Sequence, residues 1–213
     1  MRDATAVICG ATGQVAAIAL SLTSYLRSNL ANNGAVEMAV SENITALALR
    51  LHQQGQRVAL ATVMATWGSA PRPIGAQMVI CADGSFHGSV SGGCVEGAVV
   101  LEALEALEAG QCLRLRYGVA DADAFAVGLA CGGEIELVVE PVGQGQGIAP
   151  AVLERLVEAQ SAREPLALRL DLSNWRRDII SAQTDPSVFA AGGGLAGDVF
   201  TYVQTVPLRL VII

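Results

Sequence analysis

Residues 89–110 read SVSGGCVEGAVVLEALEALEAG and place the end of a strand, a glycine-rich turn and a long helix directly after one another. The apolar spacing and the glycine that follows predict a helix over 94–109, ended by Gly110. Gly93 is the expected N-cap and Glu96 falls near the third helical position. A helix that starts straight after a glycine turn offers unpaired backbone N–H groups at its opening.

Cys94 is then expected in the first turn of this helix, where the helix dipole favours both a bound anion and a thiolate. Gly92 and Gly93 would allow a ligand such as a phosphate to approach the backbone closely. A second interpretation stays open, because cysteine is among the most buried residue types. In that case Cys94 is a small core residue where the helix meets the sheet.

Residues 127–141, VGLACGGEIELVVEP, carry a second cysteine beside a glycine pair. Cys131 precedes Gly132 and Gly133, and an alternating strand over 134–140 follows. A loop cysteine between glycines is more accessible than a core one, although the glycines can equally serve a tight turn. If this loop meets the Cys94 loop, two soft sulfur groups lie beside an anion site.

Residues 70–78, APRPIGAQM, form a third candidate segment. Arg72 stands between Pro71 and Pro73, which stiffen the backbone, and a guanidinium can make paired hydrogen bonds to phosphate. Gln77 offers both a donor and an acceptor, as recognition of a pterin requires. The alternative for Arg72 is a surface cation that pairs with a carboxylate.

The remaining sequence alternates short strands, hairpin turns and helices, which indicates an α+β domain. We expect a mixed sheet with hairpins and two to three packed helices. Besides 94–109, helices are expected at 44–54, where Ser41, Glu42 and Asn43 form a capping pattern, and at 149–161. Strands are expected at 58–66, 76–81, 85–90, 113–117, 134–140, 166–172 and 178–183.

Composition narrows the classes of function. The 213 residues carry a net charge of -7, and an acidic surface without a basic stripe argues against nucleic-acid binding. No apolar run reaches the ~20 residues of a membrane span. Five cysteines, an odd number, fit reduced cytosolic thiols better than a disulfide framework. His52 is expected to be solvated and Trp67 to pack inside the fold.

Three stretches, in this order, resemble the XdhC/CoxI family of molybdenum-hydroxylase maturation factors. They are ATWGSAPRPIGAQMVI (65–80), DGSFHGSVSGGCVEGAV (83–99) and VGLACGGEIELVVEPV (127–142). The resemblance implies a cytoplasmic, often dimeric protein that binds molybdenum cofactor (molybdopterin). It further implies sulfuration of that cofactor with a cysteine desulfurase and delivery to xanthine dehydrogenase or a related molybdenum hydroxylase.

Cys94 and Cys131 match the two motif cysteines of the family. The expected cofactor-binding residues are Cys94, Cys131, Arg72, Gln77, Gly92, Gly93 and Glu96. No catalytic residue is assigned and metal ligands are left open. An accessory chaperone is therefore expected rather than a catalyst.

The resemblance also suggests a division of the chain. Residues 1–37 are expected to be an N-terminal extension of unclear role, 38–142 the cofactor-binding domain and 143–207 a continuation of helix and hairpin. Residues 208–213 resemble the first strand of the Rossmann-like domain into which family members usually continue, and we expect the chain to be truncated before that domain.

Four functions are compatible with this sequence. The first is cofactor chaperoning, in which paired thiols beside an anion site hold a molybdenum–dithiolene centre. The second is a thiol-dependent sulfur transferase that carries a persulfide on Cys94 or Cys131. A nucleotide-binding oxidoreductase would need the longer form of the protein, and a scaffold module would bind only the dehydrogenase.

Overall fold

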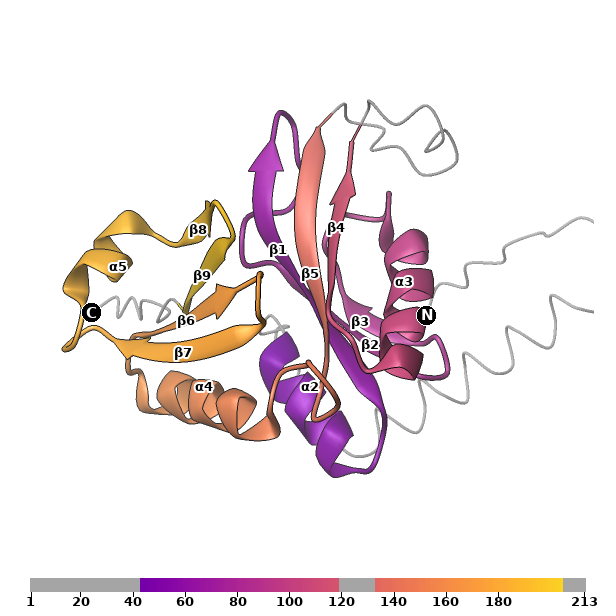
Figure 1. Cartoon of the computed structure of the whole chain (residues 1–213), viewed down its shortest axis with the longest axis horizontal. Helices are drawn as coiled ribbons and strands as arrows, with labels where there is room; N and C mark the ends of the chain where they lie inside the picture. Colours follow the sequence, from indigo (N-terminus) through magenta and orange to yellow (C-terminus); the bar gives the residue numbers. More distant parts are fainter. Residues whose placement is uncertain (1–42, 119–132, 205–213) are drawn as a thin grey trace, which may run out of the picture. The chain divides into compact units, whose positions relative to one another are not determined.

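The structure, a computed structural model, describes residues 43–118 and 133–204, which fall in one compact unit that begins at Glu42. The predicted segments 1–37 and 208–213 and the second cysteine, Cys131, lie outside the described residues. Two sheets and four helices make up the described part of the chain (Figure 1). The expected α+β class is therefore confirmed.

The helices are α2 (Ile44–Gln53), α3 (Glu96–Ala109), α4 (Pro150–Ala162) and α5 (Pro186–Ala191). The strands of the first sheet are β1 (Val58–Trp67), β2 (Gln77–Cys81), β3 (Phe86–Gly88), β4 (Leu113–Tyr117) and β5 (Glu134–Pro141). The strands of the second sheet are β6 (Leu166–Asp171), β7 (Arg176–Ser181), β8 (Gly194–Ala196) and β9 (Val199–Gln204).

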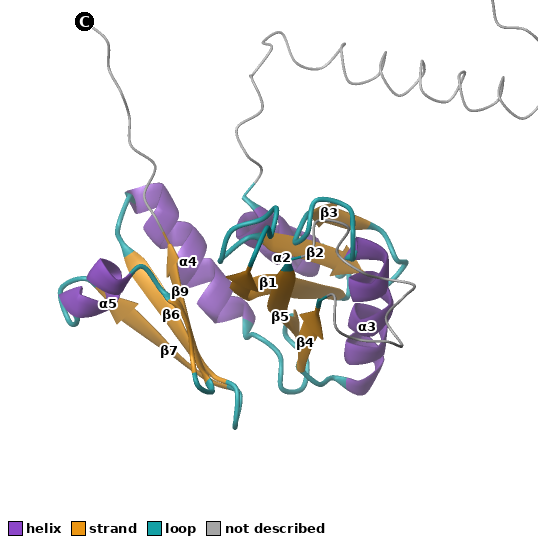
Figure 2. Ribbon diagram, turned by 90° about the horizontal axis from the view of Figure 1, so that it is seen from above, coloured by secondary structure: helices purple, strands orange, loops and turns teal. Residues whose placement is uncertain are grey.

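The first sheet has the order β3-β2-β1-β5-β4 and is covered on both faces (Figure 2). Because strand side chains alternate between faces, Ala59 and Ala61 of β1 pack under α3, while Val58 and Leu60 pack toward α2 and α4. Strand β1 is thus apolar on both faces and forms the centre of the domain. Its far end, at Trp67, leads into the segment that carries Arg72.

Helix α2 follows the predicted capping pattern. The side chain of Asn43 accepts a hydrogen bond from the backbone N–H of Ala46 at 3.2 Å, as an N-cap does. The helix ends at Gln53, and Gly55 beyond it has a φ of +83°, which favours glycine. The predicted capped helix is confirmed.

The second sheet has the order β7-β6-β9-β8, and its apolar side chains pack on the first sheet. The sequence predicted the β6–β7 hairpin but missed α5, β8 and β9. The expected mixed sheet is wrong, since every strand pair in both sheets is antiparallel. Helix α3 explains this for the first sheet: it carries the chain from the β3 edge to β4 on the opposite edge, so it joins no neighbouring parallel strands.

Within the described ranges, no helix combines the length and the apolar character that crossing a membrane requires.

Candidate functional site

The turn between β3 and α3, residues 89–95, closes around the side chain of Glu96; we call it the Cys94 turn. The two carboxylate oxygens of Glu96 accept hydrogen bonds from three backbone N–H groups and two hydroxyls of this turn. The donors are Val90 N (3.1 Å), Ser91 N (2.9 Å), Gly93 N (2.9 Å), Ser89 Oγ (2.7 Å) and Ser91 Oγ (2.5 Å). The carboxylate is the centre of the turn, and only 6% of Glu96 is exposed.

Serine hydroxyls take up the remaining backbone donors of the turn. The Ser91 hydroxyl accepts from the N–H groups of Cys94 at 3.0 Å and Val95 at 2.9 Å. The Ser89 hydroxyl accepts from the N–H of Gly92 at 2.9 Å. Every backbone N–H from Val90 to Val95 is therefore hydrogen-bonded to a side chain of Ser89, Ser91 or Glu96.

Two details of the prediction for this segment are wrong. Helix α3 begins at Glu96 with Val95 as its N-cap, so Gly93 is not the cap and Cys94 precedes the first helical turn. The backbone N–H groups of the turn do not await an external anion either, because the protein's own carboxylate and hydroxyls use them. Glu96 takes the place that a bound phosphate would have.

Glu96 stays ionised in this position. Burial opposes the charge, but hydrogen bonds from Ser91, from Ser89 and from the backbone outweigh it and lower the pKa of Glu96 from 4.5 to about 2. The structure therefore gives Glu96 a role in holding the turn, whereas the sequence suggested contact with a cofactor.

Cys94 is a free thiol of intermediate exposure. Its side chain packs at the edge of the apolar core between α3 and the sheet. Gly93, beside it, has open space where a side chain would stand. Cys94 is thus partly accessible on one side and supported by the core on the other.

The segment between β1 and β2, residues 68–76, lies against the Cys94 turn; we call it the Arg72 loop. The exposed Arg72 donates from Nε to the hydroxyl of Ser89 at 3.3 Å. A methyl group at Gly92 would lie 3.6 Å from the ring of Pro71. Within residues 43–118 and 133–204, the terminal guanidinium nitrogens of Arg72 have no hydrogen-bond partner, so they can bind an anion beside the turn.

Gln77 lies away from this group. Its amide donates to the hydroxyl of Thr62 at 3.3 Å and accepts from the hydroxyl of Thr45 in α2 at 2.8 Å. It therefore points to the α2 face of the sheet, whereas Cys94 packs on the α3 face. The structure does not bring Gln77 together with Arg72 and Cys94, because one strand position sets which face a side chain occupies.

The other end of the Arg72 loop meets the start of β5. A methyl group at Gly133 would lie 2.9 Å from the backbone nitrogen of Ala70 and 3.0 Å from the carbonyl oxygen of Trp67. Trp67 itself is 45% exposed, and the guanidinium of Arg116 lies 5.2 Å from the centre of its ring. The expectation that Trp67 packs inside the fold is wrong, because the ring is at the rim of this group of loops.

A comparison with known protein families finds a match to this part of the chain. The sequence profile of the XdhC and CoxI family matches residues 51–118, a range that contains both the Arg72 loop and the Cys94 turn. Through this segment the chain is similar to the XdhC and CoxI family.

Two Escherichia coli K12 proteins are similar in sequence. The molybdenum cofactor insertion chaperone PaoD is 40% identical over 128 residues, which are 60% of this chain and 38% of PaoD. The uncharacterized protein YqeB is 37% identical over 101 residues, which are 47% of this chain and 18% of YqeB. The chain thus spans well under half the length of these relatives.

A crystal structure described as a xanthine dehydrogenase from Bacillus halodurans shares the fold. It superimposes with a TM-score of 0.58 at 20% identity, over 76% of this chain and 52% of the other. At this identity the likeness concerns the fold.

A buried ion pair outside the XdhC and CoxI segment was missed by the sequence analysis. Arg177 of β7 donates from Nε to Glu140 of β5 at 2.8 Å, and their closest N–O distance is 2.6 Å. The guanidinium also contacts Cys112 Sγ at 3.4 Å and donates to the carbonyl of Gln146 at 3.0 Å. Burial, together with the charge of Glu140, raises the pKa of the Cys112 thiol to about 12.

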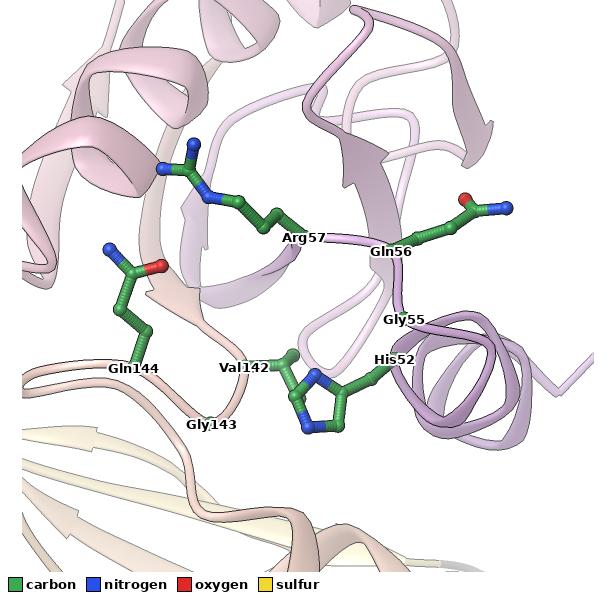
Figure 3. Close-up of a pocket in the computed structure, with 7 residues that line it drawn as sticks. All are labelled: His52, Gly55, Gln56, Arg57, Val142, Gly143 and Gln144. Atoms are coloured by element: carbon green, nitrogen blue, oxygen red, sulfur yellow. The ribbon is translucent and has the colours of Figure 1, made fainter.

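Figure 3 shows a pocket at the other end of the first sheet, where β1 begins, at the far end of α3 from the Cys94 turn. It has a volume of about 260 Å³, and its polar lining residues are His52, Gln56, Arg57 and Gln144. Arg57 and Gln144 both donate to the carbonyl of Leu107, at 2.5 and 2.7 Å, so these side chains cap the end of α3. His52, expected to be solvated, lines this pocket.

Proposed function

We propose that this chain binds the molybdenum cofactor and takes part in its insertion into a molybdenum hydroxylase such as xanthine dehydrogenase. The observation that carries the proposal is the contact between the Arg72 loop and the Cys94 turn within the segment that the family profile matches. Similarity to PaoD, whose name states cofactor insertion, points to the same activity.

The chemistry of the two loops suits an anionic, sulfur-bearing cargo. Arg72 has terminal guanidinium nitrogens that bond to none of the described residues and suit the phosphate of a pterin, and it lies beside a thiol that can contact a molybdenum–dithiolene centre. Gly93 has open space where a side chain would stand, which leaves room for the ligand to approach the turn, whereas Gly92 faces the ring of Pro71. Glu96 fixes the shape of the turn, and Gln77 has no part in this version of the site.

Cys131 is included in the proposed site because of its position in the sequence. It stands two residues before Gly133, which contacts the backbone of the Arg72 loop. We propose that Cys131 supplies the second thiol. Support comes from the described end of that segment and from the match of both cysteines to the motifs of the family.

The wider process is part of the same proposal. We propose a cysteine desulfurase as the source of the sulfido ligand, a molybdenum hydroxylase as the recipient, a homodimer as the working form and the cytoplasm as the location. These follow from family resemblance. They can be tested separately from cofactor binding, since none of them concerns the residues of the site.

Retention of cofactor by the purified 213-residue chain tests the proposal. The chain would be incubated without oxygen with cofactor released from a purified molybdoenzyme, and molybdenum would be measured per chain after gel filtration. Arg72→Ala should weaken retention about tenfold or more, because a charged hydrogen bond contributes ~1.5–3 kcal/mol. Cys94→Ala should weaken it as well.

Matched variants control for general damage. Arg176→Ala removes an exposed arginine from the second sheet, and Cys81→Ala removes a buried free thiol. Both should retain cofactor like the parent. Equal retention by Arg72→Ala, Cys94→Ala and the parent would contradict the proposed site. Rapid, selective alkylation of Cys94 without any cofactor retention would favour the sulfur transferase.

A further inference from the structure

The Arg72 loop is held between two parts of the molecule that are distant in sequence. On one side Pro71 and Arg72 contact the Cys94 turn. On the other side the loop meets the second sheet, where a methyl group at Gly75 would lie 3.1 Å from Cε2 and 3.3 Å from Cδ2 of Tyr202. A methyl group at Gly194, in β8 of the same sheet, would lie 3.8 Å from Cδ1 of Ile74.

The contact with Tyr202 is close because position 75 is glycine. Gly75 has a φ of +84°, and the absence of a side chain lets the tyrosine ring lie directly on the loop backbone. The N–H of Gly75 donates to the carbonyl of Val63 at 2.8 Å, and the N–H of Ala76 donates to the carbonyl of Pro73 at 3.0 Å. Strand β1 and the ring of Tyr202 therefore fix this end of the loop from two directions.

Tyr202 is well placed to support the loop. It lies in β9, where it is paired with Leu168 of β6, and its ring packs against the apolar clusters on both sides of it. Burial also raises the pKa of its hydroxyl. A ring held in this way cannot shift without disturbing the core of the second sheet.

We infer that Tyr202 is a positioning residue, through which the second sheet holds the Arg72 loop in the conformation that presents Arg72 beside Cys94. This inference rests on the proposed function, since it concerns the anion-binding side of the same site. It makes the second sheet, which lies outside the segment matched by the family profile, a part of the machinery of the site.

Hydrogen–deuterium exchange of the full chain tests the positioning directly. Tyr202→Ala removes the ring, Tyr202→Leu keeps apolar bulk without a flat surface, and Tyr202→Phe keeps the ring. Ile180→Ala is the control, because Ile180 is buried in β7 of the second sheet and belongs to neither of the apolar clusters that Tyr202 packs against. The amide of Gly75 should exchange faster in Tyr202→Ala and Tyr202→Leu than in Ile180→Ala, and Tyr202→Phe should match the parent.

Cofactor binding provides the second measurement. With the same released molybdenum cofactor as probe, Tyr202→Ala should bind on the order of tenfold more weakly, since a small misplacement of a contact residue is costly. Tyr202→Phe should restore the parent affinity, and Ile180→Ala should keep it. Exchange and binding in Tyr202→Ala and Tyr202→Leu that equal those of Ile180→Ala would overturn the inference. If the parent itself binds no cofactor, the proposed function fails, and the exchange rates alone decide whether Tyr202 positions the loop.

Discussion

Glu96 and Glu140 are both buried carboxylates beside the first sheet, with 6% and 4% exposure, yet different groups surround them. Glu96 accepts hydrogen bonds from the backbone and from two serines, all within seven residues along the chain. Glu140 is paired with Arg177, which comes from the second sheet, 37 residues away. One carboxylate shapes a local turn and the other joins two layers.

The two environments move the pKa values in opposite directions. Hydrogen bonds from neutral donors outweigh burial at Glu96 and lower its pKa. At Glu140 burial dominates and raises the pKa, and Arg177 offsets only part of the rise. The comparison teaches that several aligned neutral donors can keep a buried carboxylate ionised, while a single cation offsets only part of the cost of burial.

Removing the cation at Glu140 should have the largest effect. Arg177→Ala leaves a buried carboxylate unpaired, and this should lower the free energy of unfolding by roughly 3–5 kcal/mol. Urea unfolding would measure the loss. Asp198→Ala is the control, because it breaks the more exposed pair with Arg114 and should cost less than about 1 kcal/mol. Similar losses in both variants would mean that the buried pair does not join the layers.

The second largest effect is a dependence of the free energy of unfolding on pH, caused by Glu96. A folded pKa of about 2 against 4.5 means that ionised Glu96 stabilises the fold fully above about pH 4.5. The stabilisation, roughly 3 kcal/mol, should be lost as the pH falls from 4.5 toward 2. Glu96→Gln should remove this part of the acid loss, as measured by urea unfolding at a series of pH values.

Ionisation of Glu140 should change the stability in the opposite direction. Since its folded pKa is raised, its ionisation costs stability as the pH rises above its unfolded value, so it adds nothing to the acid loss. Glu140→Gln should therefore keep the loss between pH 4.5 and 2. If Glu140→Gln and Glu96→Gln flattened the curve equally, the assignment to Glu96 would be wrong.

The sequence predicted those parts of the fold that depend on local patterns. The apolar run of β1, the Asn43 cap and the glycine after α3 each lie within a few residues of the element they define, and all appear in the structure. The location of Arg72 in a loop beside the cysteine turn also agrees. Family resemblance pointed to the same segment, and the profile match confirms it.

Features that depend on distant partners were not predictable. Within residues 134–140 all three glutamates fall on one face of the strand, which resembles a strand whose second face is solvated. In the structure the second sheet covers that face, and Glu136 is buried beside Arg114. No sequence pattern in β5 predicts that Glu140 pairs with Arg177 of β7. Gln77 was misjudged for the same reason, because its partners in β1 and α2 fix its direction only once the fold has formed.

The smallest of the three effects tests whether the Cys94 turn is as self-contained as the comparison suggests. The Ser91 hydroxyl donates to Glu96 and accepts from the backbone N–H groups of Cys94 and Val95. Ser91→Ala leaves those two N–H groups without their acceptor, and we expect a loss of about 1–2 kcal/mol in the free energy of unfolding.

The loss in Ser91→Ala should also be local, because these partners lie in the turn or, for Glu96, at the first residue of α3. Exchange of the Cys94 and Val95 amides should accelerate, while exchange in β7 around Arg177 stays at the parent rate. Ser187→Ala, at the exposed start of α5, is a matched loss of a serine that should leave the turn unchanged. If exchange in β7 rose together with that in the turn, the two carboxylates would belong to one cooperative unit, and the distinction between a local and a layer-joining carboxylate would not hold.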